Sequence, residues 1–269
     1  MIETSLVKKG HKVTLKSSQG ARQIIENVAG FLTGRLARPA LPAAFNFRPA
    51  AEVVTLPTGF RALDKALGIG GLPLGKITEL MGAEVEASSG ALLLAAGIAA
   101  KVQRKQQIVT IIDLSHQFDP WLAERCGLMA PHLLLTRPET ALAALTTLEG
   151  VAAREGLVLV VMGVVADLFS QSERSLLHTL LGRLRAIVRQ SNSAFLFVTA
   201  PSEDTPFSPA NYPAGFPLAE IANIRLWIQA DAWTHQHGIA TAYKASLAVI
   251  KNEWAVAGAG ADIRISLTR

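Results

Sequence analysis

The spacing of hydrophobic residues changes near residue 53 of this chain. From there to the end, continuous apolar runs alternate with segments whose apolar residues recur every three or four positions. Such runs predict strands, and the helical spacing predicts amphipathic helices. We expect strands at 76–81, 108–113, 132–136, 157–163, 194–199, 223–229 and 243–250, with a last one near 262–267. We expect helices at 60–67, 90–104, 119–126, 139–154 and 173–190.

This alternation predicts an α/β fold with a central sheet. Strands that are apolar along their whole length, such as residues 157–163, are covered on both faces. They are typical of a mostly parallel sheet with helices on both sides. The last strands are joined by short connections, so we expect them to be antiparallel.

The first 52 residues follow a different pattern. Residues 1–16 show no clear hydrophobic period and are expected to form an arm without regular structure. Between Ser18 and Pro39 the apolar residues return at helical spacing and predict a helix, with Ser18 as its N-cap. Residues 38–52 form a linker rich in Pro and Ala. We therefore divide the chain into an N-terminal region, 1–52, and a core domain, 53–269.

Composition supports a folded core and a reducing compartment. Half of the 269 residues are hydrophobic and 17% are charged, so a sizeable buried core is expected. No apolar stretch is long enough to span a bilayer, and the N-terminus lacks the apolar segment of a signal peptide. Cys126 is the single cysteine, which excludes an intrachain disulfide. We expect a cytoplasmic protein.

Positive charge gathers at the N-terminus. Residues 1–50 contain eight Lys and Arg against two Glu, whereas the rest of the chain is close to neutral. A basic arm suits contact with nucleic acid, which would place the protein at the nucleoid, or with an acidic protein surface. A solubilising tail is the alternative. The DNA-contact hypothesis rests on Lys8, Lys9, Lys12 and Lys16.

A glycine turn leads from the strand at 76–81 into a buried helix. A phosphate-binding loop at such a junction needs a Lys followed by Ser or Thr, because Lys neutralises the phosphates and the hydroxyl binds Mg²⁺. Here no Lys or Arg occurs between Gly82 and Lys101, and the turn contains Glu84 and Glu86. The sequence has the form of a nucleotide-binding junction without its cations.

Several motifs in order resemble the RecA recombinase family over nearly all of 53–269. They are Thr58–Asp64, Leu67–Gly75, Ile112–Pro120, Gln190–Asn192 and Val249–Asn252. The resemblance implies a RecA-like P-loop NTPase fold with a mostly parallel sheet and antiparallel C-terminal strands.

The chain departs from this family where the family's chemistry resides. With the glycines Gly82 and Gly90 aligned, the family's Lys and Ser/Thr fall on Ala91 and Leu92; with the gap placed later, they fall on Ser88 and Ser89. The other family positions, for the Mg²⁺-binding Asp, the catalytic Glu and the γ-phosphate-sensing Gln, fall on Met162, Ser115 and Ala200. Without these groups nothing stabilises phosphoryl transfer, so we expect no hydrolysis, no cofactor and no metal.

One cation of the family's site is retained. The resemblance implies that Lys251 reaches a nucleotide across a subunit interface, although the second basic position is Glu253. A residual nucleotide-binding protein that borrows groups from a neighbouring subunit therefore stays an alternative.

The segments that correspond to the family's DNA-binding loops also lack positive charge. The family's two DNA loops correspond to the segment before Arg174 and to residues 200–222, and Ser191–Ile224 contains no Lys or Arg. Loops without cations supply little affinity for phosphates. Residues 201–217 are interpreted as a protein-contact segment or an irregular surface loop. Arg183, Arg185 and Arg189 form either a secondary DNA patch or a solvated helix face.

The linker contains a docking signature of archaeal and eukaryotic relatives. Phe47-Arg-Pro-Ala50, preceded by Phe45, resembles the Phe-x-x-Ala motif that docks onto a neighbouring subunit. An aromatic anchor on an extended segment suits a pocket beside a sheet edge. Packing of the linker on its own core is the alternative.

Among degenerate RecA-like proteins, the chain resembles the ImuA type, an accessory protein of damage-induced mutagenic DNA synthesis. The resemblance rests on Gly70–Pro73, Phe118–Pro120 and Leu133–Pro138. It implies contacts with RecA, with a Y-family-polymerase-like protein and with a second copy of the chain. Two alternatives stay open: a regulator of recombinase filaments and a SulA-type inhibitor of cell division.

Overall fold

The structure, a computed structural model, describes residues 4–8, 11–15, 53–83, 89–202 and 207–268. It divides into two compact units, Met1–Phe45 and Asn46–Arg269, each of which is described by itself. The expected boundary at 52/53, the expected helix after Ser18 and the linker 38–52 lie outside the described residues.

The first unit contains a β-hairpin where we expected an arm without regular structure. Strand β1 (Thr4–Lys8) pairs antiparallel with β2 (His11–Leu15), with Thr4 opposite Leu15 and Lys8 opposite His11. Only Lys9 and Gly10 separate the strands, and a two-residue connection ending in Gly is typical of a tight hairpin. The expectation for residues 4–15 was wrong because these strands are too short to show a hydrophobic period.

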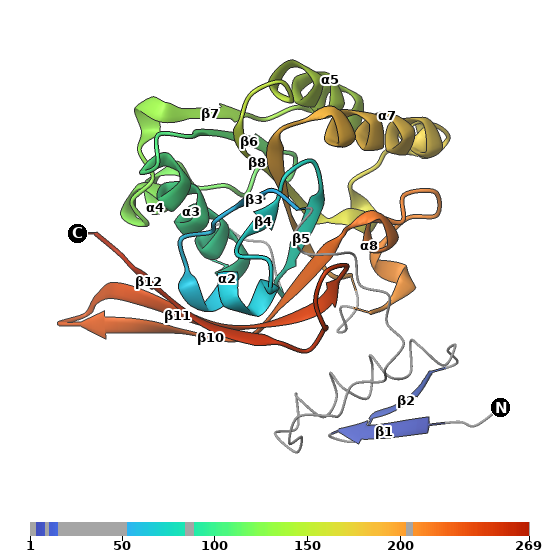
Figure 1. Ribbon diagram of the computed structural model, residues 1–269. Helices are drawn as coiled ribbons and strands as arrows, with labels where there is room; N and C mark the ends of the chain where they lie inside the picture. Colours follow the sequence, from blue (N-terminus) through green and yellow to red (C-terminus); the bar gives the residue numbers. More distant parts are fainter. Residues whose placement is uncertain (1–3, 9–10, 16–52, 84–88, 203–206, 269) are drawn as a thin grey trace. The chain divides into compact units, whose positions relative to one another are not determined.

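The second unit is built on an eight-stranded sheet with the order β12-β11-β10-β5-β9-β8-β6-β7 (Figure 1). The pairs from β10 to β7 are parallel, and β10, β11 and β12 pair antiparallel. Both the mostly parallel sheet and the antiparallel C-terminal strands are thereby confirmed. The strands are β5 (Ile77–Met81), β6 (Ile108–Asp113), β7 (Leu133–Thr136), β8 (Gly156–Val164), β9 (Ser193–Ala200), β10 (Ile224–Gln236), β11 (Ile239–Asn252) and β12 (Gly260–Ser266). A separate small sheet pairs β3 (Thr55–Leu56) with β4 (Leu72–Pro73).

Helices cover both faces of the sheet. The α-helices are α2 (Arg61–Leu67), α3 (Gly90–Gln103), α4 (Pro120–Arg125), α5 (Ala141–Val151), α6 (Gln171–Arg174), α7 (Leu177–Gln190) and α8 (Leu218–Ile221). Short 3₁₀ turns occupy Ala130–His132, Val165–Asp167 and Pro209–Asn211. Among the described residues, no helix combines the length and apolar character needed to cross a membrane.

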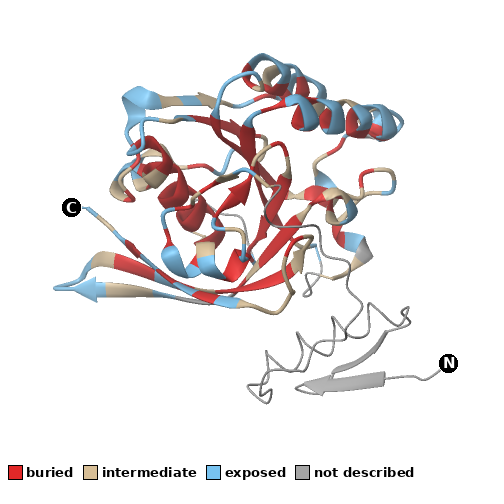
Figure 2. Cartoon of the chain, in the orientation of Figure 1, coloured by how far each residue is buried: buried red, intermediate tan, exposed pale blue. Residues whose placement is uncertain are grey.

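The sheet separates two hydrophobic cores. One packs α3 and α2 against alternate residues of the strands, and the other lies under α5 and α7 (Figure 2). Helix α3 is buried on almost every side, because Ala, Leu and Gly let it lie close to the sheet. Alternate residues of one strand therefore serve different cores: Leu80 of β5 belongs to the α3 core and Ile77 to the α5/α7 core.

The expected elements agree with the observed ones apart from their ends. The helix expected at 173–190 is divided into α6 and α7. Strands β10 and β11 extend beyond 223–229 and 243–250 into a long hairpin that turns at His237 and Gly238. Both turn residues have positive φ (49° and 79°), as a two-residue hairpin turn requires. The polar residues Thr234, His235 and Gln236 had hidden this extension from the hydrophobic pattern.

Candidate functional site

The expected nucleotide-site residues gather at the carboxyl ends of four adjacent parallel strands. Gly82 follows β5, Ser115 follows β6, Met162 lies near the end of β8, and Ala200 ends β9. The backbone N–H of Gly82 donates to Thr199 O (3.2 Å), and that of Ser115 donates to Val161 O (3.3 Å). The structure thus brings these positions together, as expected for a site at the carboxyl edge of a parallel sheet.

The beginning of α3 presents apolar side chains at this edge. Ser89 is the N-cap, and Gly90, Ala91 and Leu92 of the first turn are buried, with Ala91 at 0% and Leu92 at 3% exposure. The Ser89 hydroxyl makes no capping bond, and its buried Oγ has no hydrogen-bond partner among the described atoms. Ser88 lies outside the described residues. The first turn therefore offers backbone N–H groups but neither a cation nor, at positions 91 and 92, a hydroxyl.

Asp113, the last residue of β6, holds a turn at this edge. It is fully buried and accepts bonds from the backbone N–H groups of Gln117 (3.2 Å) and Phe118 (3.0 Å). It also accepts from the Ser115 hydroxyl (3.2 Å) and pairs with Arg137 Nε (3.1 Å). A carboxylate with four donors is a structural centre, so Asp113 and Ser115 both serve to shape the turn after β6.

On the face of the sheet opposite α3, a buried polar network joins four segments. Glu79 of β5 pairs with Arg225 Nε of β10 at 2.6 Å, and both side chains are almost fully buried. The Tyr212 hydroxyl donates to Glu79 Oε1 (2.6 Å) and accepts from an Arg225 guanidinium nitrogen (2.6 Å). Thr199 of β9 also donates to Glu79 Oε1 (3.0 Å). We call Glu79, Thr199, Tyr212 and Arg225 the central network.

The central network fixes the segment after β9. Burial and the neighbouring Glu79 carboxylate raise the pKa of Tyr212 far above its ordinary value, so its hydroxyl stays a donor at every pH at which the protein is handled. Phe216 packs against Phe169 with ring centroids 5.0 Å apart, which adds an apolar anchor. The described part of this segment, residues 207–217, is therefore attached to the sheet through Tyr212 and to the connection between β8 and α6 through Phe216.

Lys251 of β11 lies opposite Arg225 in the sheet, and its ammonium is already hydrogen-bonded. Register in the β10–β11 pair shifts between Arg225 and Leu226, so Arg225 lies opposite Lys251 while Leu226 lies opposite Val249. This bulge moves Lys251 away from the α3 core, to which Val249 belongs. Its ammonium donates to the carbonyls of Ala219 (3.1 Å) and Glu220 (2.7 Å) at the end of α8. Desolvation lowers the pKa of Lys251.

Sequence reasoning missed the central network. Glu79 inside the buried strand Ile77–Met81 was a signal, because a buried carboxylate requires a partner. The identity of that partner depends on strand register: Arg225 lies beside Glu79 only because β10 pairs with β5.

The expected DNA and docking residues are partly described. Arg183 of α7 pairs with Glu149 of α5 (2.7 Å), whereas Arg185 and Arg189 are exposed. Lys8 ends β1 and Lys12 lies in β2, within the hairpin rather than in an unstructured arm. Lys9, Lys16, Phe45, Phe47 and Ala50 lie outside the described residues.

Comparison with known proteins identifies the family of this chain. The RecA N-terminal domain family matches residues 46–268, which is most of the chain. This chain belongs to the RecA family. The family assignment confirms the expectation from the sequence motifs, and the RecA-like core accounts for the strand order and the position of α3.

Relatives named Protein RecA are 26–32% identical to this chain over the aligned residues. The protein of Thermus thermophilus is 32% identical over 238 residues, covering 82% of this chain and 69% of the relative. Protein RecA of Aquifex aeolicus is 29% identical over 220 residues, covering 76% and 63%. Protein RecA of Ruminococcus albus is 26% identical over 261 residues, covering 91% and 64%. The match therefore extends over most of this chain and about two thirds of each relative.

Proposed function

We propose that this chain is a RecA-family protein that has lost nucleotide hydrolysis and acts through protein contacts in the DNA damage response. The observation that carries the proposal is the composition of the carboxyl edge. Buried Ala91 and Leu92 lie in the first turn of α3, Met162 lies near the end of β8, and Ala200 ends β9. Phosphoryl transfer requires cations and a water-orienting group at such an edge, and these side chains supply neither.

The contacts of three cations of the core domain support the same proposal. Arg137 is bound to Asp113 and the Phe118 carbonyl, Arg225 to the central network, and Lys251 to the end of α8. Moving any of them to a phosphate would leave a buried carboxylate or a helix end without its partner, which is costly. Binding of nucleotide at this edge is therefore disfavoured as well as hydrolysis.

The proposed role is that of an accessory protein in mutagenic DNA synthesis, acting on RecA and a Y-family-polymerase-like partner at the nucleoid. Support comes from the RecA-like core together with the ImuA-type motifs, and from the Phe-x-x-Ala signature at Phe47 and Ala50. A RecA-like body without ATPase chemistry can still present a RecA-like surface to other RecA-family subunits.

The test is affinity capture with the full-length chain from DNA-damaged cells, comparing Phe47→Ala with Ile239→Ala as a control. Ile239 is an exposed apolar residue at the start of β11, outside the signature. We expect RecA or a polymerase-like protein with the wild type and the control, and at least a tenfold loss with Phe47→Ala, since an aromatic anchor can contribute about 2 kcal/mol or more. Capture of a tubulin-like division GTPase, or equal capture by all three proteins, would contradict the proposal.

A further inference from the structure

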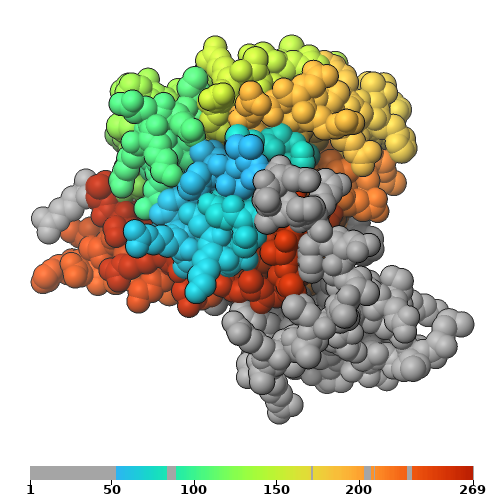
Figure 3. Space-filling model, viewed as in Figure 1, coloured from blue at the N-terminus to red at the C-terminus, as the bar shows by residue number. Residues whose placement is uncertain are grey.

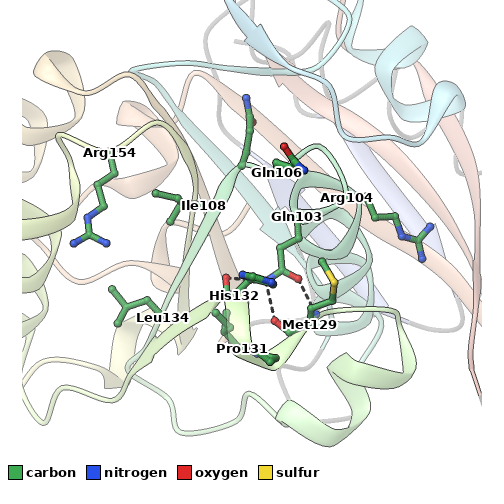
Figure 4. Close-up of a pocket in the computed structure, with 11 residues that line it drawn as sticks. Gln103, Arg104, Gln106, Ile108, Met129, Pro131, His132, Leu134 and Arg154 are labelled. Carbon is green, nitrogen blue, oxygen red and sulfur yellow. Dashed lines mark hydrogen bonds between the residues drawn. The ribbon is translucent and has the colours of Figure 1, made fainter.

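Two cavities lie side by side at the amino ends of the parallel strands, opposite to the carboxyl edge. One, of 710 Å³, lies at the start of β6 and β7 and at the end of α3 (Figure 4). The other, of 580 Å³, lies at the start of β5, β8 and β9 and beside β3. In Figure 3 the blue atoms of the β3 segment lie beside the golden atoms of α7. Gln107 lines both cavities, which we together call the amino-end groove.

The amino-end groove is strongly basic. Its described lining includes five Lys and Arg and one carboxylate, Glu155. All of these cations except the half-buried Lys76 are exposed, and none of the five forms an ion pair with a carboxylate among the described residues. The five cations are Lys76, Arg104, Lys105, Arg154 and Arg189. Unpaired cations gathered on one face create a positive potential that attracts a polyanion.

The walls of the groove are held in place by hydrogen bonds. Gln103 donates to the carbonyls of Met129 (3.2 Å) and His132 (2.9 Å) and accepts from the Met129 N–H (2.7 Å), as Figure 4 shows. Hydroxyls of Ser191 and Ser193 donate to the carbonyls of Ala152 and Arg154. The segment Met129–His132 and the connection that carries Arg154 are thus held in place before any ligand arrives, which lowers the entropic cost of binding.

We propose that the amino-end groove binds the phosphate backbone of double-stranded DNA. The groove crosses five neighbouring strands, β5, β9, β8, β6 and β7. At about 4.8 Å per strand this is about 19 Å, the length of about six base pairs. The described lining contains no Phe, Tyr or Trp, so base stacking of single strands is not what the groove offers. This inference goes beyond the proposed protein contacts, because it places a DNA contact at the amino ends of the strands, whereas the segments that correspond to the family's DNA loops follow the carboxyl ends of β8 and β9.

The test measures binding of a fluorescein-labelled 20-base-pair duplex by anisotropy across a series of NaCl concentrations. The variant is Arg104→Ala/Arg154→Ala, and the control is Lys244→Ala/Arg264→Ala, which removes two exposed cations from β11 and β12. Each lost phosphate contact reduces the slope of log K against log[salt] by about 0.9. We expect the groove variant to lower the slope by about 2 and the control to leave it unchanged. An unchanged slope in the groove variant would overturn the proposal.

A second variant tests the groove by gain of affinity. Glu155→Gln removes the groove's carboxylate, and we expect it to tighten duplex binding about two- to fivefold, the effect of one surface charge interaction. No change in affinity would contradict the proposal. A labelled poly-glutamate peptide is tested in parallel: binding of this peptide in the groove without binding of the duplex would overturn the DNA assignment in favour of an acidic protein partner.

Discussion

At the scale of single residues, the central network is the most consequential feature of the chain. The Tyr212 hydroxyl donates to Glu79 and accepts from Arg225, so one phenol forms a hydrogen bond with each of the two charged groups. The buried Glu was visible in the sequence as a carboxylate inside an apolar strand. Its partners were not predictable, because Tyr212 and Arg225 lie more than a hundred residues further along the chain.

Removing the bridging hydroxyl should destabilise the fold measurably. For Tyr212→Phe we expect the free energy of unfolding to fall by about 2 kcal/mol, since hydrogen bonds to charged groups contribute about 1.5–3 kcal/mol. Glu79→Gln should cost more, about 3–5 kcal/mol, because it leaves Arg225 buried and uncompensated. Urea unfolding of both single variants and the double variant measures the coupling. Additive effects within about 0.3 kcal/mol would mean that the two residues do not act as a network.

The burial of Cys126 leads to a separate prediction for the stability of the fold at alkaline pH. Burial, partly offset by Arg125, raises the pKa of its thiol from 9.0 to about 11. The unfolded thiol therefore ionises first, and the stability that it contributes is complete below pH 9 and lost as the pH rises toward 11. Between these values we expect the wild type to lose about 2 kcal/mol more than Cys126→Ala, measured by urea unfolding at both pH values. Equal losses in the two proteins would contradict this burial of the thiol.

At the scale of secondary structure, hydrophobic spacing predicted the helices and strands of the core well. Helix α3 and strands β6 and β9 were clear because they are apolar along nearly their whole length. The two-residue strands β3 and β4 and the hairpin of β1 and β2 were missed, since strands this short show no period. The bulge that turns Lys251 was also not predictable, because a single extra residue changes the pairing without changing the composition.

That bulge leads to a prediction for Lys251. Lys251→Met keeps the aliphatic stem and removes both bonds to the carbonyls at the end of α8. We expect a loss of about 1–2 kcal/mol in the free energy of unfolding and faster amide exchange in α8, because these carbonyls lose their donor. Lys244→Met, at an exposed position of the same strand, is the control and should change neither quantity. Unchanged exchange in α8 would show that Lys251 is free for another ligand.

At the scale of the whole core domain, a RecA-family fold is combined with a carboxyl edge at which Ala91, Leu92, Met162 and Ala200 are buried. The fold was predictable from ordered motifs along residues 53–269, and membership of the family confirms it. The amino-end groove was not predictable, because its cations come from the ends of β5, α3, β8 and α7 and are far apart in the sequence. Of the DNA cations that we expected in the arm and on α7, only Arg189 lines the groove.

The central claim is that this RecA-family chain does not hydrolyse nucleotide, and ATP turnover tests it most directly. Phosphate release is measured with Mg²⁺ and single-stranded DNA, beside an active RecA-family ATPase. We predict no release above the protein-free background, because Ala91, Leu92, Met162 and Ala200 supply neither cation nor water-orienting group. DNA-stimulated release that is lost in both Ser89→Ala and Lys251→Met would contradict the account and restore this edge as a working active site.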